Sequence, residues 1–318
     1  MNTAVKEKKL HLLARLNQLG SQVGNTPLHL FTEIFSKKGV FIYAKQEWKQ
    51  LSGSVKCRAA YNIFRHAVSA GALNEEITLL DATSGNTGIA YATLGAKLGI
   101  RVALCLPENV SAVTTEKLKS LGATIIPTSR FEGTDGAQEV ATALAAKYPQ
   151  KYFYADQYKN PNNWKAHYDT TSIEIFSALP GITHFVAGLG TTGTFVGTGR
   201  RLKELNPDIH LTCLQPDAAL HGLEGWKHLE TAVVPKIYDP TIADQQLEIS
   251  TEEAYEVIKT AYRYEGLSLS PSSAANLAGA IRVAEKLEQG IVVTVLPDNA
   301  DKYNVLHSLG EINFSTNQ

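Results

Sequence analysis

Short apolar runs alternate along the chain with longer stretches whose apolar residues recur every three or four positions. The short runs predict strands at about residues 40–46, 77–82, 101–107, 123–128, 151–155, 183–188, 209–216 and 291–297. The longer stretches predict helices at about residues 55–71, 87–99, 113–122, 135–148, 194–205, 250–266 and 272–290. Strands that are apolar on both faces and alternate with helices predict an α/β fold, with mostly parallel sheets flanked by helices.

The pattern is regular at the start of the chain and least regular at about residues 216–247. Residues 1–20 predict an amphipathic helix rather than a signal peptide, because Arg15 interrupts the apolar part. Residues 250–253 predict a capping box at a helix start. We expect a functional loop at about residues 216–247, where no periodicity persists.

The composition is that of a globular chain with a sizeable core. Of 318 residues, 44% are hydrophobic and 19% charged, and 30 basic against 31 acidic residues give a net charge of −1. This balance does not indicate a nucleic-acid partner, and no apolar run of about 20 residues predicts a membrane span. Three distant cysteines, Cys57, Cys105 and Cys213, predict neither a disulfide framework nor a zinc site. We expect a cytoplasmic protein without a metal.

One lysine stands where a helix disfavours its charge. In "LSGSVKCRAA" Ser54 is the predicted N-cap, and Lys56 falls in the first turn, where the helix dipole is positive. An amine that deprotonates easily can act as a nucleophile. Taken alone, the motif fits a surface lysine at a helix start better.

A polar loop follows the strand predicted at 77–82. In "DATSGNTG" the side chains of Thr83, Ser84, Asn86 and Thr87 gather at a helix N-terminus. Hydroxyls, an amide and backbone N–H groups there suit a carboxylate or another small anion. An ordinary capped turn uses the same residue types, but four polar side chains with two glycines exceed what capping needs.

A glycine-rich loop follows the strand predicted at 183–188. In "AGLGTTGT" the glycines let the backbone approach a ligand, and three threonines offer hydroxyls, so a phosphate is the expected guest. The spacing is not that of a Walker loop. Gly188, Gly190 and Gly193 match a dinucleotide fingerprint only weakly, because the next strand ends in Gln215 and not in an acidic residue.

A third loop, "SPSSAAN" at residues 270–276, opens a helix. Ser272 and Ser273 could simply cap that helix, or one hydroxyl could hydrogen-bond a ring nitrogen. A phosphate-binding loop, a reactive lysine, an asparagine and such a serine together describe a pyridoxal phosphate site. The lysine would hold that cofactor as a Schiff base.

The chain resembles a known family through segments that stand in a fixed order. They are "VGNTPL", "GSVKCRAA", "TSGNTG", "DQYKNPNNWKAHYDTT", "GLGTTGT", "SPSSAAN" and "VLPDNADKY". Together they resemble the fold-type-II pyridoxal phosphate enzymes, the superfamily of the tryptophan synthase β subunit. More narrowly, they resemble the cysteine synthases (O-acetylserine sulfhydrylases) of the B type. The resemblance implies a homodimer with two lobes. The small mobile lobe would span residues 47–159, and the large phosphate-binding lobe residues 1–46 and 160–318.

The resemblance also implies roles for individual residues. Lys56 would carry pyridoxal 5'-phosphate, Asn86 would bond the ring hydroxyl and Ser272 would face the ring nitrogen. The phosphate would lie against Gly190, Thr191, Thr192, Gly193 and Thr194. The substrate carboxylate would lie against Thr83, Ser84, Thr87 and Gln157. The implied reaction is a β-replacement that forms L-cysteine from O-acetyl-L-serine or O-phosphoserine and sulfide through an aminoacrylate, with Lys56 moving the α-proton.

Several alternatives stay open at this point. Cys57, where many relatives have aspartate, is interpreted as structural. One of His221, Lys227 and His228 could recognise a phosphorylated leaving group, although a solvated loop explains each of them more simply. Other reactions of this scaffold are cystathionine β-synthase, cyanoalanine or diaminopropionate synthase and serine or threonine dehydratase chemistry. A regulatory nucleotide-binding protein without pyridoxal phosphate, or an idle relative that binds another enzyme's tail, are rivals from other classes.

Overall fold

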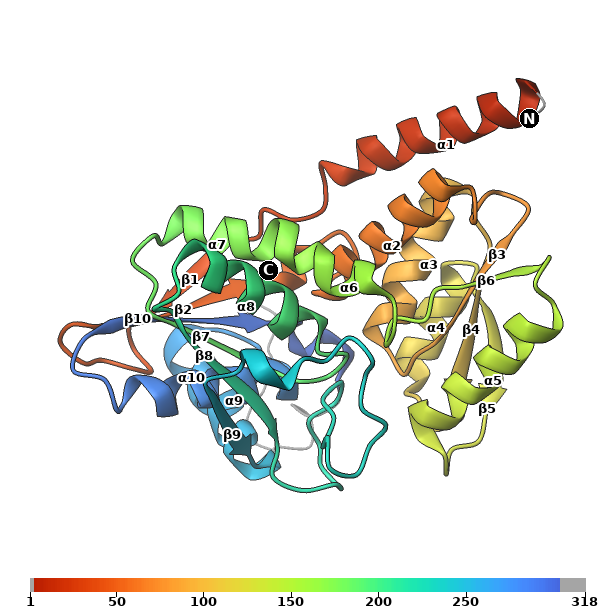
Figure 1. The fold of residues 1–318 in the computed structure, drawn as a ribbon. Helices are drawn as coiled ribbons and strands as arrows, with labels where there is room; N and C mark the ends of the chain where they lie inside the picture. The colour runs from red at the N-terminus through yellow and green to blue at the C-terminus, as the bar shows by residue number, and fades with distance from the viewer. Residues whose placement is uncertain (1–2, 304–318) are drawn as a thin grey trace.

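The computed structural model describes residues 3–303, which form two sheets covered by helices (Figure 1). The larger sheet has the order β1 (Leu28–Phe31), β2 (Val40–Gln46), β10 (Gly290–Leu296), β7 (His184–Gly188), β8 (His210–Pro216) and β9 (Gln245–Ile249). The smaller sheet has the order β5 (Thr124–Thr128), β4 (Val102–Pro107), β3 (Thr78–Ala82) and β6 (Tyr152–Tyr154). All neighbouring strands run parallel except β1 and β2. The predicted α/β fold is thus confirmed.

Ten α-helices are present among the described residues. They are α1 (Thr3–Gly20), α2 (Lys56–Ala70), α3 (Asn86–Leu98), α4 (Ala112–Ser120), α5 (Gly133–Lys147), α6 (Pro161–Ala166), α7 (Ser172–Ala178), α8 (Gly193–Leu205), α9 (Thr251–Glu265) and α10 (Pro271–Ala284). A π-helical turn, η2 (His167–Thr171), joins α6 to α7, and 3-10 turns lie at η1 (Glu47–Lys49), η3 (Pro240–Ile242) and η4 (Ala300–Lys302). No helix of residues 3–303 combines the length and the hydropathy that crossing a bilayer requires.

The smaller sheet is buried on both faces, which explains its apolar strands. One face packs on α2 and α3 through a cluster that includes Leu79, Leu104 and Phe64. The other face packs on α5 through Leu80, Cys105 and their neighbours. Helix α1 lies outside α2 and α3 and adds leucines to the first cluster (Figure 1).

In the larger sheet α10 lies close to the strands because its residues are small. A Cβ on Gly279 would come within 2.4 Å of the side chain of Leu214 on β8. Helix α9 packs on the outer side of α10. Helix α10 ends at Ala284, earlier than the predicted residue 290, and the chain then turns into β10.

Two of the predicted caps have different outcomes. Ser250 caps α9 as predicted, because its side chain accepts a hydrogen bond from the backbone N–H of Glu253. The prediction that Ser54 caps α2 is wrong. The position before the helix is Val55, the buried hydroxyl of Ser54 has no partner among the described residues, and the N–H of Val55 donates to the carbonyl of Pro297 at 2.8 Å. Pro297, the residue that follows β10, therefore fixes the start of α2.

Candidate active site

One cavity brings the predicted site residues together at the carboxyl ends of β3, β7 and β10. In open α/β sheets this edge is where ligands bind. The predicted residues that line it are Lys56, Thr83, Ser84, Asn86, Thr87, Gln157, Gly190, Thr191, Thr192, Thr194 and Ser272. Gly193 is the one predicted residue outside this lining, and it begins helix α8 beside it.

Lys56 is the first residue of α2 and lines this cavity. Burial lowers the pKa of its amine, although the carboxylates of Asp298 and Glu47 oppose the shift. Desolvation by burial is the largest cause of this lowered pKa. An amine with a lowered pKa is more often unprotonated and is therefore a better nucleophile and base.

The glycine-rich loop leaves no room for side chains at its three glycines. A Cβ on Gly188 would lie 2.1 Å from the ring of Trp226. A Cβ on Gly190 would lie 2.1 Å from the carbonyl oxygen of Gly225, and one on Gly193 would lie 2.1 Å from Oδ1 of Asn163. Thr192 has a φ of +71° and a buried hydroxyl with no partner among the described residues. The N-terminus of α8 and this unpaired hydroxyl are groups that suit an anion, as the sequence predicts for this loop.

The polar loop after β3 meets a glutamine from the loop after β6. Thr87 donates its hydroxyl proton to Oε1 of Gln157 at 2.6 Å, and Nε2 of Gln157 donates to the carbonyl of Ala82 at 2.8 Å. Because β3 and β6 are parallel neighbours, both loops leave the same edge of the sheet. The hydroxyl of Thr83 accepts from the N–H of Gly85 at 3.1 Å, which fixes the turn.

The serines at the start of α10 have separate tasks. Ser270 caps the helix by accepting from the N–H of Ser273, whose own hydroxyl donates to the carbonyl of Asp298 at 2.6 Å. The interpretation of Ser272 and Ser273 as simple caps is therefore wrong. Ser272 is 5% exposed and lines the cavity.

The sequence profile of the pyridoxal-phosphate dependent enzymes matches residues 19–298. The chain belongs to this family. It is 45% identical over 289 residues to a cysteine synthase of Aquifex aeolicus, covering 88% of both chains. It is 35% identical to cysteine synthase B of Salmonella typhimurium, covering 94% of this chain and 98% of that protein. The solved O-acetylserine dependent cystathionine β-synthase of Helicobacter pylori is similar at a TM-score of 0.84 and 32% identity, over 90% of this chain and 96% of that one.

The residues of this chain fit the cofactor that gives the family its name. The N-terminus of α8 and the unpaired hydroxyl of Thr192 are groups that suit a phosphate. The desolvated amine of Lys56 lies in the same cavity and can attack an aldehyde. The family membership favours this cofactor over the nucleotide-binding alternative.

Two asparagines that the sequence analysis missed support the glycine-rich loop. Asn163 donates to the carbonyl of Gln157 at 2.8 Å and to the hydroxyl of Thr191 at 3.1 Å. Asn276 accepts from the N–H of Gly188 at 2.7 Å. A signal for the first existed, because an N-cap asparagine and a proline at the first helical position precede it. Asn276 lies one helical turn after Ser272, so helix periodicity could have indicated it.

At the mouth of the site an ion pair joins the first turn of α5 to the loop between β8 and β9. Lys227 donates to Oδ1 of Asp135 at 2.7 Å, and Oδ2 of the same carboxylate accepts from the N–H of Val233 at 3.1 Å. The charge of Lys227 is thus paired in this structure. His221, Lys227 and His228 line a second cavity that shares Tyr158 and Trp226 with the first.

Cys57 lies next to Lys56 in sequence but is fully buried. Burial raises the pKa of its thiol, so the thiolate is disfavoured. Both observations support the structural interpretation. Cys105 and Cys213 are likewise buried, and none of the three forms a disulfide.

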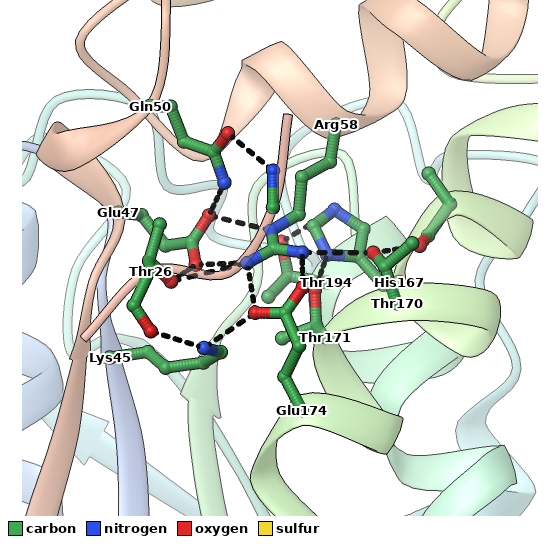
Figure 2. A network of polar contacts seen from close by, with 12 residues as sticks. Thr26, Lys45, Glu47, Gln50, Arg58, His167, Thr170, Thr171, Glu174 and Thr194 are labelled. Atoms are coloured by element: carbon green, nitrogen blue, oxygen red, sulfur yellow. Dashed lines mark hydrogen bonds and ion pairs between the residues drawn. The ribbon is translucent and has the colours of Figure 1, made fainter. Parts of the chain in front are cut away.

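A buried network of charges lies behind the start of α2 (Figure 2). The guanidinium of Arg58 donates to Glu47 through Nε and Nη2, both at 2.8 Å, and to Glu174 at 2.6 and 2.8 Å. Lys45 completes the set with a 2.6 Å ion pair to Glu174. Burial alone would raise the pKa of Glu174, but hydrogen bonds and charge from Arg58 lower it to about 2. Two cations and two anions therefore balance in the interior.

The same region extends to the glycine-rich loop through a histidine. Nδ1 of His167 contacts the hydroxyl of Thr171 at 2.9 Å, and Nε2 contacts that of Thr194 at 3.4 Å (Figure 2). Burial lowers the pKa of His167 to about 3, so the ring is neutral at physiological pH. A neutral imidazole can donate from one nitrogen and accept at the other.

Proposed function

We propose that this chain is a cysteine synthase that forms L-cysteine from O-acetyl-L-serine or O-phosphoserine and sulfide by β-replacement. The observation that carries the proposal is the single cavity in which Lys56 meets both the glycine-rich loop and the polar loop after β3. The high identity to a relative named cysteine synthase supports it.

Each predicted residue has a role in this proposal. Bound pyridoxal 5'-phosphate supplies the electron sink that stabilises a negative charge at the substrate α-carbon. Lys56 holds the cofactor and later takes the α-proton, for which its lowered pKa is suited. Asn86 and Ser272 contact the ring. Residues 190–194 hold the phosphate. Thr83, Ser84, Thr87 and Gln157 hold the substrate carboxylate, and closure of their loop excludes water.

The proposal includes the architecture around the site. All strands of the smaller sheet fall within residues 47–159, which supports a small lobe with these bounds and a large lobe from 1–46 and 160–318. We further propose a homodimer, as the resemblance implies. Three free and buried cysteines support a reducing compartment such as the cytoplasm.

The test is direct. The purified protein is loaded with pyridoxal 5'-phosphate and mixed with sulfide and either O-acetylserine or O-phosphoserine, and cysteine is quantified by chromatography. We expect cysteine from at least one donor. Lys56→Ala should lower the rate by at least about 10²- to 10⁴-fold, because base and cofactor anchor are both lost. A loaded protein that forms no cysteine with either donor contradicts the proposal.

A second reaction is supported by the structural similarity to an O-acetylserine dependent cystathionine β-synthase. Such a protein would use a thiol larger than sulfide, and the second cavity adjoining the first offers space beside the site mouth. The same assay with homocysteine in place of sulfide separates the two. A higher kcat/KM for homocysteine would favour the second reaction.

A further inference from the structure

The side chain of Asn86 is held by two charged groups of opposite sign. Nδ2 of Asn86 donates to Oδ2 of Asp298 at 2.8 Å, and Nζ of Lys302 donates to Oδ1 of Asn86 at 2.5 Å. The partners lie 212 and 216 positions away in sequence. They therefore bring the last described segment of the chain to the first residue of α3.

The chemistry of these partners permits one orientation of the amide. A carboxylate oxygen only accepts, so it requires the Nδ2 side, and an ammonium only donates, so it requires the Oδ1 side. A flipped amide would place oxygen against Asp298 and N–H groups against Lys302, which is repulsive at both ends. In the observed orientation Nδ2 of Asn86 faces Asp298 and Oδ1 faces Lys302.

The two partners are themselves fixed. Asp298 is fully buried; its Oδ2 accepts from the hydroxyl of Tyr303 at 2.8 Å, and its carbonyl accepts from Ser273 at 2.6 Å. Lys302 lies 3.8 Å from the same carboxylate oxygen and also donates to the carbonyl of Gly53 at 3.4 Å. The pair is close to neutral as a unit, so it orients the amide without adding net charge to the cavity.

We propose that Asp298 and Lys302 are positioning residues that hold the amide of Asn86 in one orientation for its contact with the cofactor. This inference rests on the proposed function in one respect, the contact of Asn86 with the cofactor ring. Neither residue was assigned a role in the sequence analysis. The segment "VLPDNADKY" thereby has a physical task, which is to fix a ring contact contributed by α3.

The test is a double-mutant cycle on cofactor binding. Apoprotein variants Asn86→Ala, Lys302→Met and the double variant are titrated with pyridoxal 5'-phosphate, and binding is followed by cofactor absorbance. Lys302→Met should weaken binding about tenfold, the value of one charge-assisted hydrogen bond. In the Asn86→Ala background, Lys302→Met should change the affinity for pyridoxal 5'-phosphate by less than about twofold, because there is no amide left to orient.

A matched control and a second readout complete the experiment. Lys117 lines the same surface groove as Lys302 and is exposed, so Lys117→Met should leave cofactor binding within about twofold. The absorbance of the bound cofactor should titrate with a shifted midpoint in Lys302→Met but not in Lys117→Met. Asp298→Asn should shift the midpoint too, since it leaves Lys302 uncompensated. Thermal unfolding of each apoprotein reports whether the variant folds.

Two outcomes overturn the inference. One is an equal effect of Lys302→Met in both backgrounds, and the other is a Lys302→Met variant that binds like Lys117→Met. Coupled effects in a loaded protein that forms no cysteine would refute the proposed function and leave the positioning role in place. Cysteine formation with additive effects would refute the positioning role alone.

Discussion

Thr192 and Lys56 each place a polar group beside the cavity at a cost in free energy. The hydroxyl of Thr192 is buried and unpaired among the described residues, and the amine of Lys56 is desolvated. Both arrangements cost free energy in the protein alone. A ligand that bonds the hydroxyl and condenses with the amine would recover that cost, which is why these atoms mark the site more clearly than any motif.

Replacing Thr192 by valine separates ligand binding from stability. Valine keeps the shape and removes the hydroxyl, so we expect the free energy of unfolding of the apoprotein to stay equal or rise slightly. The affinity for pyridoxal 5'-phosphate should fall about tenfold with the lost hydrogen bond. Thr198→Val in the same helix is the control, because its hydroxyl is also buried and unpaired but lies outside the cavity. Equal affinities of the two variants would contradict the role of Thr192.

His167 makes the stability of the protein depend on pH. Its pKa is about 3 in the folded chain and about 6.5 in an unfolded one, so below pH 6.5 the unfolded state binds more protons. The contribution of His167 to the free energy of unfolding is therefore fully present above pH 6.5. It is lost as the pH falls below 6.5, by up to about 1.4 kcal/mol per pH unit. Burial raises the pKa of Asp81 to about 7, which has the opposite effect.

Because Asp81 opposes the effect of His167, the pH dependence of the protein must be compared with that of a His167 variant. Urea unfolding of the apoprotein between pH 6.5 and 4.5 should show that His167→Gln loses about 1 kcal/mol less per pH unit than the unsubstituted protein. His11→Gln changes an exposed histidine and should keep the original slope. A slope in His167→Gln equal to that of His11→Gln would be incompatible with a neutral buried ring.

At the scale of elements, the sequence predicted those strands and helices that a local hydrophobic pattern determines. Every predicted strand is present. Most are apolar runs buried in a sheet, whereas β5 and β6 are partly exposed edge strands. The sequence analysis missed β1 and β9, which are edge strands of only four and five residues. It also missed α6, η2 and α7, which are short helical segments that pack against α2 and α8. Ser54 failed as a cap because a backbone carbonyl 242 positions later fixes that helix start.

In the site, too, the features that local sequence determines could be predicted, and those that depend on tertiary contacts could not. Loops next to predicted strands could be identified, and all the predicted site residues except Gly193 line one cavity. The residues that contact Asn86 could not be identified in this way. Asp298 and Lys302 meet Asn86 only through the tertiary fold, and no spacing in the sequence encodes that contact.

The network around Arg58 fixes helix α2 to the rest of the chain. Arg58→Met should lower the free energy of unfolding by about 3–5 kcal/mol, because it leaves Glu47 buried without its cation. Glu47→Gln combined with Arg58→Met should lose less than the sum of the single changes, since neither charge then remains unpaired. Urea unfolding of the apoproteins measures both. Arg65→Met, at an exposed position of the same helix, should cost less than about 0.5 kcal/mol. Additive losses would show that the charges do not act as a unit.

At the scale of the molecule, contacts between residues 47–159 and the remainder converge on the cavity. The network of Arg58 lies behind it, the contact of Asn86 with Asp298 lies beside it, and the pair of Asp135 and Lys227 lies at its mouth. The network of Arg58 is buried, whereas the pair of Asp135 and Lys227 is partly exposed. We therefore infer that any relative movement of the two sheets opens at the mouth and pivots near α2.

The pair at the mouth gives the last prediction. The side chains of Lys227 and Asp135 are 11% and 33% exposed, so the pair is worth only about 0–1 kcal/mol and is screened by salt. Lys227→Met and Asp135→Asn should each raise the KM for the amino-acid substrate about two- to fivefold at low salt, through a less populated closed state, and the difference should shrink at 1 M salt. Lys236→Met, at an exposed position nearby, is the control. If Lys227 instead binds a phosphate leaving group, its loss will impair O-phosphoserine but not O-acetylserine, and Asp135→Asn, by freeing that charge, will improve the use of O-phosphoserine.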